Sequence, residues 1–128
     1  MRLQGWEKRL DDYLVNIGPF VWGKSDCCMF IVGAVKAMTE IDHGKEYKYQ
    51  TEIGANRFLL KNGGVEQIAI KHFGKPKSTL LCKRGDVVSF DSGNGMALGV
   101  CLGVKIAAMQ AIGLVYLPMS KAIKGWSI

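Results

Sequence analysis

The sequence predicts a single α+β domain in which helices come first and an antiparallel β-sheet follows. Residues 6–74 carry apolar side chains at helical spacing, interrupted by helix-ending glycines. Residues 85–117 consist instead of short apolar runs separated by turns that contain glycine, which is typical of strands. Because the strands do not alternate with helices, a parallel α/β sheet is not expected. The length of 128 residues fits one domain, spanning residues 1–128, and residues 118–128 are expected to form a C-terminal tail.

Four helices are predicted from apolar spacing, capping residues and helix-ending glycines. They cover residues 6–17, a segment from Ser25 or Asp26 to about Met38, residues 51–61 and residues 65–73. Thr51 is a suitable N-cap for the third helix, since its side-chain oxygen can accept a backbone N–H of the first turn. The polar segment between Ile41 and Gln50 is expected to be a loop. In the second helix, the spacing puts Cys27 at the buried N-terminal end of the apolar face.

Strands are predicted after the turn Arg84-Gly85-Asp86, where the hydrophobic period changes. They cover residues 87–90 and 96–102, with one or two more strands between residues 106 and 116. The segment between the first two strands is rich in glycine and tolerates the left-handed backbone of a tight turn. Ser120 is expected to cap a short terminal turn before Trp126.

One long apolar stretch has the length of a membrane helix. From Met96 to Met119 the only charged residue is Lys105. Glycines interrupt this stretch, and a lysine near the bilayer centre would cost about 3 kcal/mol. Short buried strands explain the pattern better, so no transmembrane segment is expected.

The composition indicates a globular protein with an excess of positive charge. Hydrophobic residues make up 48% and charged residues 22%, which excludes a wholly disordered chain. The 17 Lys and Arg residues outnumber the 11 Asp and Glu residues, giving a formal net charge of +6. These charges are scattered, which favours a solvated surface over a dedicated anion patch. A nucleic-acid partner is not expected, because charge is its only support and no motif of a known reader is present.

The four cysteines, Cys27, Cys28, Cys82 and Cys101, are predicted to be reduced thiols. No signal peptide precedes them, so folding in a cytoplasm is expected. Adjacent Cys27 and Cys28 cannot bridge each other without strain. Because no Cys-x-x-Cys pair occurs, neither a metal site nor a cofactor is predicted.

The segment Trp22-Gly23-Lys24-Ser25-Asp26-Cys27 is the sharpest local feature. It places a thiol in the first turn of a helix, where the N-terminal dipole and unpaired N–H groups stabilise a thiolate. This is a common position for a cysteine nucleophile. Such a nucleophile also needs a base within hydrogen-bond reach, usually a histidine. Asp26, beside the thiol, is interpreted as a helix cap.

Three segments occur in a fixed order: Trp22-Gly23-x-x-Asp26-Cys27, Arg84-Gly85-Asp86-Val87-Val88-x-Phe90 and Leu98-Gly99-Val100-Cys101-Leu102-Gly103. Over roughly residues 20–117 they resemble the NlpC-type papain-like cysteine peptidases, which cleave stem peptides of bacterial peptidoglycan. Over its whole length the chain looks like small phage and prophage proteins with this domain, which are encoded among tail genes. Their pattern includes the amphipathic first helix and a C-terminal tryptophan, here Trp126. The resemblance implies a papain-like fold.

The resemblance also implies roles for individual positions. The family nucleophile falls on Cys27. The family base is a histidine that opens the second strand, and this position is Ala97, which cannot accept a proton. The third, orienting residue lies on the next strand, where Ala107 and Ala108 stand and Gln110 is the nearest polar side chain.

The sequence allows two interpretations for each of several other candidate residues. His72 is the only candidate for a substitute base, because His43 lies in the polar loop, although a lone histidine on an apolar helix face is more often a packed residue. Cys27 is either a small buried hydrophobe or a vestigial nucleophile. Trp22 and Trp126 are interpreted as core or partner-contact aromatics.

The sequence therefore predicts a catalytically inactive, peptidase-like structural or assembly protein of a bacteriophage tail, at the tail tip or baseplate. It would be made in the cytoplasm of the bacterial host, enter the virion tail if incorporated, and contact other tail proteins, with peptidoglycan as a further candidate partner. The alternative is an active cysteine endopeptidase that opens the wall during genome delivery. A third interpretation is a non-catalytic binder of the wall or of an anionic polymer.

Overall fold

The structure is a computed structural model that describes residues 2–128, and it confirms the α+β layout. The helices are α1 (Trp6–Asn16), α2 (Cys27–Thr39), α3 (Glu52–Lys61) and α4 (Val65–Phe73). The strands are β1 (Val87–Asp91), β2 (Met96–Cys101), β3 (Lys105–Gln110), β4 (Gly113–Pro118) and β5 (Ala122–Trp126). Short 3-10 helices η1 (Thr79–Leu81) and η2 (Met119–Lys121) precede β1 and β5.

The starts of the two helices that flank the site follow the predicted caps. Asp26 accepts backbone hydrogen bonds from Cys28 and Met29 at the start of α2. Thr51 accepts a backbone hydrogen bond from Gly54 at the start of α3. Each cap satisfies N–H groups that have no partner within the helix. The predicted polar loop between α2 and α3 is also confirmed.

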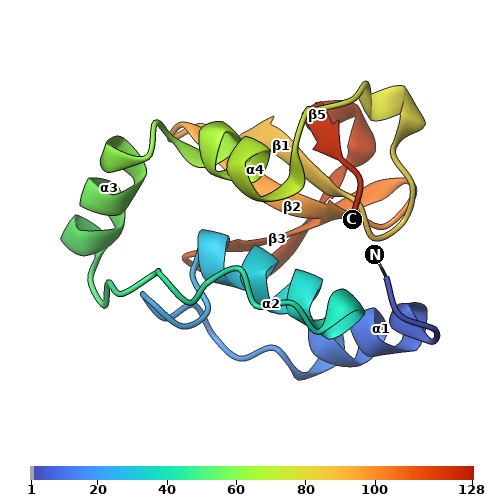
Figure 1. Cartoon of the computed structure of the whole chain (residues 1–128), viewed down its shortest axis with the longest axis horizontal. Helices are drawn as coiled ribbons and strands as arrows, with labels where there is room; N and C mark the ends of the chain where they lie inside the picture. Colours follow the sequence, from blue (N-terminus) through green and yellow to red (C-terminus); the bar gives the residue numbers. More distant parts are fainter. Residues whose placement is uncertain (1) are drawn as a thin grey trace.

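The five strands form one antiparallel sheet in the order β4-β3-β2-β1-β5 (Figure 1). Strands β1 to β4 form the predicted meander. The expected tail over residues 118–128 is wrong, because β5 pairs with β1 and places Trp126 opposite Val87. The expected Ser120 cap is wrong as well, since η2 has no side-chain cap. This weakly alternating segment becomes a strand only because it pairs with the free edge of β1.

The sheet carries a core on each face. On the helical face, Leu10 of α1 and Phe30 of α2 are fully buried. On the other face, Phe90 of β1 shares a cluster with Leu117 of β4. Ile106 of β3 is a buried member of the same cluster and pairs with Leu117, so this core extends across the sheet from β1 to β4.

Trp126 belongs to the helix-side core and is fully buried. The core interpretation of this residue is therefore confirmed. Its interpretation as a partner-contact aromatic is wrong, since pairing of β5 carries the indole inward.

Helix α3 projects from the rest of the molecule (Figure 1). Only Ala55 of this helix is buried, whereas Ile53 and Leu60 are exposed. The helix forms one wall of the cleft described below. Within residues 2–128, no helix is long and apolar enough to cross a membrane.

Candidate functional site

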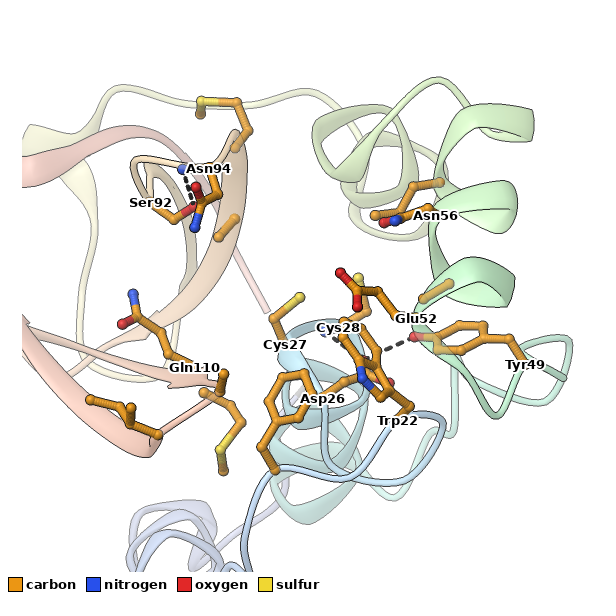
Figure 2. Close-up of a pocket in the computed structure, with 18 residues that line it drawn as sticks. Trp22, Asp26, Cys27, Cys28, Tyr49, Glu52, Asn56, Ser92, Asn94 and Gln110 are labelled. Carbon is orange, nitrogen blue, oxygen red and sulfur yellow. Dashed lines mark hydrogen bonds between the residues drawn. The ribbon is translucent and has the colours of Figure 1, made fainter.

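A cleft of about 460 Å³ opens between the N-terminus of α2, helix α3 and the sheet. Its sheet side is formed by the β1–β2 turn, the start of β2 and the end of β3. Figure 2 shows Cys27 between Glu52 and Asn56 of α3 on one side and Asn94 and Gln110 on the other. The predicted nucleophile thus lies where polar side chains from distant segments meet.

Asp26 organises the floor of the cleft. Its carboxylate is only 1% exposed, so it needs hydrogen-bond donors to offset the loss of water. The donors are the backbone N–H groups of Gly23 (2.7 Å), Cys28 (3.0 Å) and Met29 (3.1 Å) and the hydroxyl of Tyr49 (2.9 Å). The predicted cap is therefore confirmed, and it also fastens the loop that carries Tyr49 (Figure 2).

The structure explains why a glycine, Gly23, follows Trp22. Its backbone lies in the left-handed region with φ of 80°. A Cβ atom at this position would lie 2.1 Å from the carbonyl oxygen of Tyr49. The missing side chain therefore lets the Tyr49 loop reach Asp26. Burial raises the pKa of Tyr49, so its hydroxyl remains a donor.

Cys27 and Cys28 differ in burial and in ionisation. Cys28 is the buried thiol, 6% exposed, whereas Cys27 is half-buried, which corrects the expectation that Cys27 lies at the buried end. A hydrogen bond with the Cys28 side chain lowers the pKa of Cys27, against the effects of burial and of Asp26. The same bond, together with burial, raises the pKa of Cys28 well above its usual value. Cys27 is therefore the more reactive of the two free thiols.

The sheet side of the cleft presents methyl, thioether, hydroxyl and amide groups. Ala97 lines the cleft together with Cys27, and its side chain is a methyl group. Ala107 and Ala108 are buried within the sheet, so Gln110 is the polar side chain that β3 contributes to the cleft. An amide neither accepts nor releases a proton near neutral pH. This side of the cleft therefore offers hydrogen bonds and apolar contact without acid–base chemistry.

His72 does not lie beside Cys27, which corrects its candidacy as a substitute base. Its ring packs against that of His43, with 4.9 Å between the centroids. Among the described residues, neither histidine lines the cleft. Burial lowers the pKa of both rings. The two histidines therefore form a packed, neutral pair at pH 7.

Five polar cleft residues were not predicted from the sequence. Tyr49, Glu52 and Asn56 come from the loop before α3 and from α3 itself, and Ser92 and Asn94 come from the β1–β2 turn. The cap and turn signals locate these segments along the chain but do not indicate which cleft they face. Packing between distant segments brings them together, so the residue types alone carry no signal.

The whole chain, residues 1–128, matches a family described as a domain of unknown function, DUF6950. The chain belongs to the DUF6950 family. A comparison with curated proteins gave no match. The DUF6950 domain thus combines a half-buried thiol of lowered pKa with a facing wall of methyl, hydroxyl and amide groups. Such a cleft is suited to binding and to slow chemistry at Cys27, because rapid acyl transfer also needs a positioned base.

Proposed function

We propose that this protein is a catalytically inactive relative of the cysteine peptidases and serves as a structural or assembly protein of a bacteriophage tail, at the tail tip or baseplate. One observation carries the inactive part of the proposal. The cleft combines the Cys27 thiol with the Ala97 methyl group, and among the described residues no histidine lines it. The tail assignment rests on the resemblance of the sequence to small proteins encoded among tail genes.

The absence of a histidine from the described lining of the cleft argues against peptide hydrolysis. General acid–base catalysis contributes about 10²–10⁴-fold to such reactions. The lowered pKa of Cys27 supplies thiolate, but a leaving amine would still need a proton donor. Asp26 is committed to the fold instead, because its buried carboxylate caps α2 and accepts four hydrogen bonds.

The cleft retains the character of a binding groove. Trp22 and Phe20 line it as an edge-to-face pair with 4.7 Å between their centroids. Met96 and Ile112 add apolar surface on the sheet side, and Ile112 is 88% exposed. Apolar and aromatic walls with a few amides suit an extended protein segment. We therefore assign the cleft to contact with a neighbouring tail protein, and Trp22 is a partner-contact aromatic in this proposal.

The first test is hydrolysis. Purified peptidoglycan sacculi are incubated with the protein, with Cys27→Ala and with Cys82→Ala, and the muropeptides are analysed. Cys82 lies outside the lining of the cleft and serves as the matched control. We expect intact stem peptides in all three samples. Cleavage by the protein and by Cys82→Ala, but not by Cys27→Ala, would establish the endopeptidase alternative instead.

The second test addresses the tail. Mass spectrometry of purified virions and of isolated tail intermediates measures whether the chain is present and in how many copies per particle. We expect the chain in one or both fractions, at a fixed stoichiometry. Its absence from both would overturn the assignment to a tail.

A further inference from the structure

Cys28 is a cysteine of the cleft that the proposed function does not use. Its thiol is buried, 6% exposed, and lines the cleft beside Cys27. The other two cysteines are accounted for locally, since the Cys82 thiol contacts the carbonyl oxygen of Ser78 and the Cys101 thiol that of Gly103. Within residues 2–128, Cys28 has no such carbonyl contact, and its neighbour is the second thiol. A buried pair of thiols facing a cleft therefore needs its own explanation.

The geometry around this pair brings three donor atoms together. One carboxylate oxygen of Asp26 and the sulfur atoms of Cys27 and Cys28 all lie within 4.8 Å of one another. Zinc binds cysteine sulfur at about 2.3 Å and carboxylate oxygen at about 2.0–2.2 Å, so a single ion between the three atoms reaches all of them after small side-chain adjustments. We propose that Asp26, Cys27 and Cys28 form a binding site for a thiophilic divalent ion, with Zn²⁺ as the best match.

The hydrogen bonds of Asp26 leave room for this ligand role. Its Oδ1 accepts from Cys28, Met29 and Tyr49, whereas Oδ2 accepts only from Gly23. A carboxylate oxygen has two lone pairs, so Oδ2 keeps one that can bind an ion. Tyr49, 2.9 Å from Oδ1, then holds the carboxylate in position, as partners of metal-binding groups commonly do.

Charge and access also favour a cation. The lining of the cleft contains the carboxyl groups of Asp26 and Glu52 and, among the described residues, no lysine or arginine. Figure 2 shows the carboxyl group of Glu52 directed into the cleft near the cysteine pair. Because Cys27 is half-buried and lines an open cleft, an ion can enter from solvent. This local negative character stands out in a chain of net charge +6.

Binding of Zn²⁺ displaces two thiol protons. The thiols of Cys27 and Cys28 each release one proton to solvent, and each sulfur forms a bond to Zn²⁺. With the Asp26 carboxylate the site then carries a net charge of −1, and the fourth tetrahedral position faces the cleft. A disulfide is the competing use of two thiols. Adjacent Cα atoms lie only about 3.8 Å apart, closer than the roughly 4.4 Å that disulfides need, so a shared ion suits this pair better.

The test is a titration of the full-length, reduced protein. Zn²⁺ affinity is measured by competition with a chromophoric chelator, and Co²⁺ serves as the spectroscopic probe through its thiolate charge-transfer band. We expect one ion per chain and a band typical of two thiolates. Cys27→Ser and Cys28→Ser should each weaken Zn²⁺ binding about 100-fold or more, and Tyr49→Phe about tenfold with the band retained. Cys82→Ser is the matched control and should leave affinity and band unchanged.

Two results would overturn the site: binding to Cys28→Ser as tight as to the unaltered protein, or no one-to-one binding by the unaltered protein. Circular dichroism and thermal melting check that the variants fold. A second measurement needs no variant, because bound Zn²⁺ should protect Cys27 from alkylation by iodoacetamide, and prior alkylation should abolish the Co²⁺ band. Unprotected alkylation at saturating Zn²⁺ would also overturn the proposal.

The tests of the ion site and of the proposed function are independent of each other. Cleavage of sacculi by metal-free protein would overturn the inactive-peptidase proposal and leave the titration result standing. Absence of Zn²⁺ binding would remove the ion site and leave the hydrolysis result unaffected.

Discussion

Two of the three sides of the cleft, the α2 wall and the sheet wall, are built in different ways. The α2 wall consists of a buried carboxylate with four hydrogen-bond donors and a pair of thiols with opposite pKa shifts. The sheet wall consists of Ala97, Met96, Gln110 and their neighbours, which carry no titratable group. In a cysteine peptidase both walls would contribute to catalysis. Of these two walls, only the α2 wall carries titratable groups here, and it is the wall that the fold needs for its own stability.

This difference gives the Asp-Cys element a structural role that does not depend on hydrolysis. Asp26 caps α2 and fastens the loop that carries Tyr49, so losing it damages the fold directly. Ala97, in contrast, packs against the core cluster that contains Phe90, on the other face of the sheet. Substitutions on the two walls should therefore differ strongly in their effect on stability.

The largest effect is expected for Asp26→Ala. The change removes the acceptor of three backbone N–H groups and of the Tyr49 hydroxyl, all in a buried position. Loss of the cap, together with buried donors left without an acceptor, should lower the free energy of unfolding by about 3 kcal/mol or more. Urea denaturation measures the free energy of unfolding. On the opposite wall, Gln110→Ala should change it by no more than about 0.5 kcal/mol, and equal losses would refute the contrast between the walls.

A smaller effect is expected for Tyr49→Phe. It removes one hydrogen bond to a charged acceptor and keeps the ring packed on Phe58, so the loss should be about 1.5 kcal/mol. Tyr116→Phe is the control, because Tyr116 is 53% exposed and lies on β4. If both variants unfold at the same urea concentration, the Tyr49–Asp26 bond contributes nothing to stability.

Cys28→Ala tests the coupling between the two thiols. Because the bond with Cys28 lowers the pKa of Cys27, its removal should raise that pKa and reduce the thiolate fraction at pH 7. Alkylation of Cys27 by iodoacetamide, followed by peptide mass spectrometry in the presence of a chelator, should slow about three- to tenfold. The difference should vanish at a pH above both pKa values. Cys28→Ser keeps a donor and should react like the unaltered protein; slowing in both variants would assign the effect to packing instead.

The fold was predictable wherever a signal is local in sequence. Caps at Asp26 and Thr51 and the glycine-rich β1–β2 turn mark element boundaries within a few residues, and the structure confirms them. Strand β5 was missed because its stability comes from pairing with β1, more than 30 positions earlier in the chain. Its buried aromatic residue, Trp126, gives the same sequence signal in a core as at an interface.

In the candidate site, too, residues with a local sequence signal were predicted and residues placed by tertiary contacts were not. The Asp26 cap and the placement of the Cys27 thiol in the first turn of α2 were predicted, because both follow from adjacent positions at a helix start. Tyr49 was missed because a loop conformation that depends on Gly23 brings it to the cleft, and Glu52 was missed because the placement of α3 does so. The contact between His43 and His72 was missed as well, because no periodic pattern links the loop after α2 with the end of α4.

That histidine pair gives the smallest expected effect. Burial lowers the pKa of both rings below the usual 6.5. For His43, the charge of Asp42 opposes this shift. For His72, the charges of His43 and Lys71 add to the shift and that of Glu46 opposes it. As the pH falls through about 6.5, the unfolded chain therefore binds protons before the folded one, and stability decreases. Because both rings are partly exposed, solvent screening should keep the loss between about pH 7.5 and 5.5 below about 1 kcal/mol. Urea denaturation of the protein and of the double variant His43→Gln/His72→Gln across this range measures the slope. The double variant should show a flatter profile, and identical slopes would mean that the contact between the rings does not couple protonation to folding.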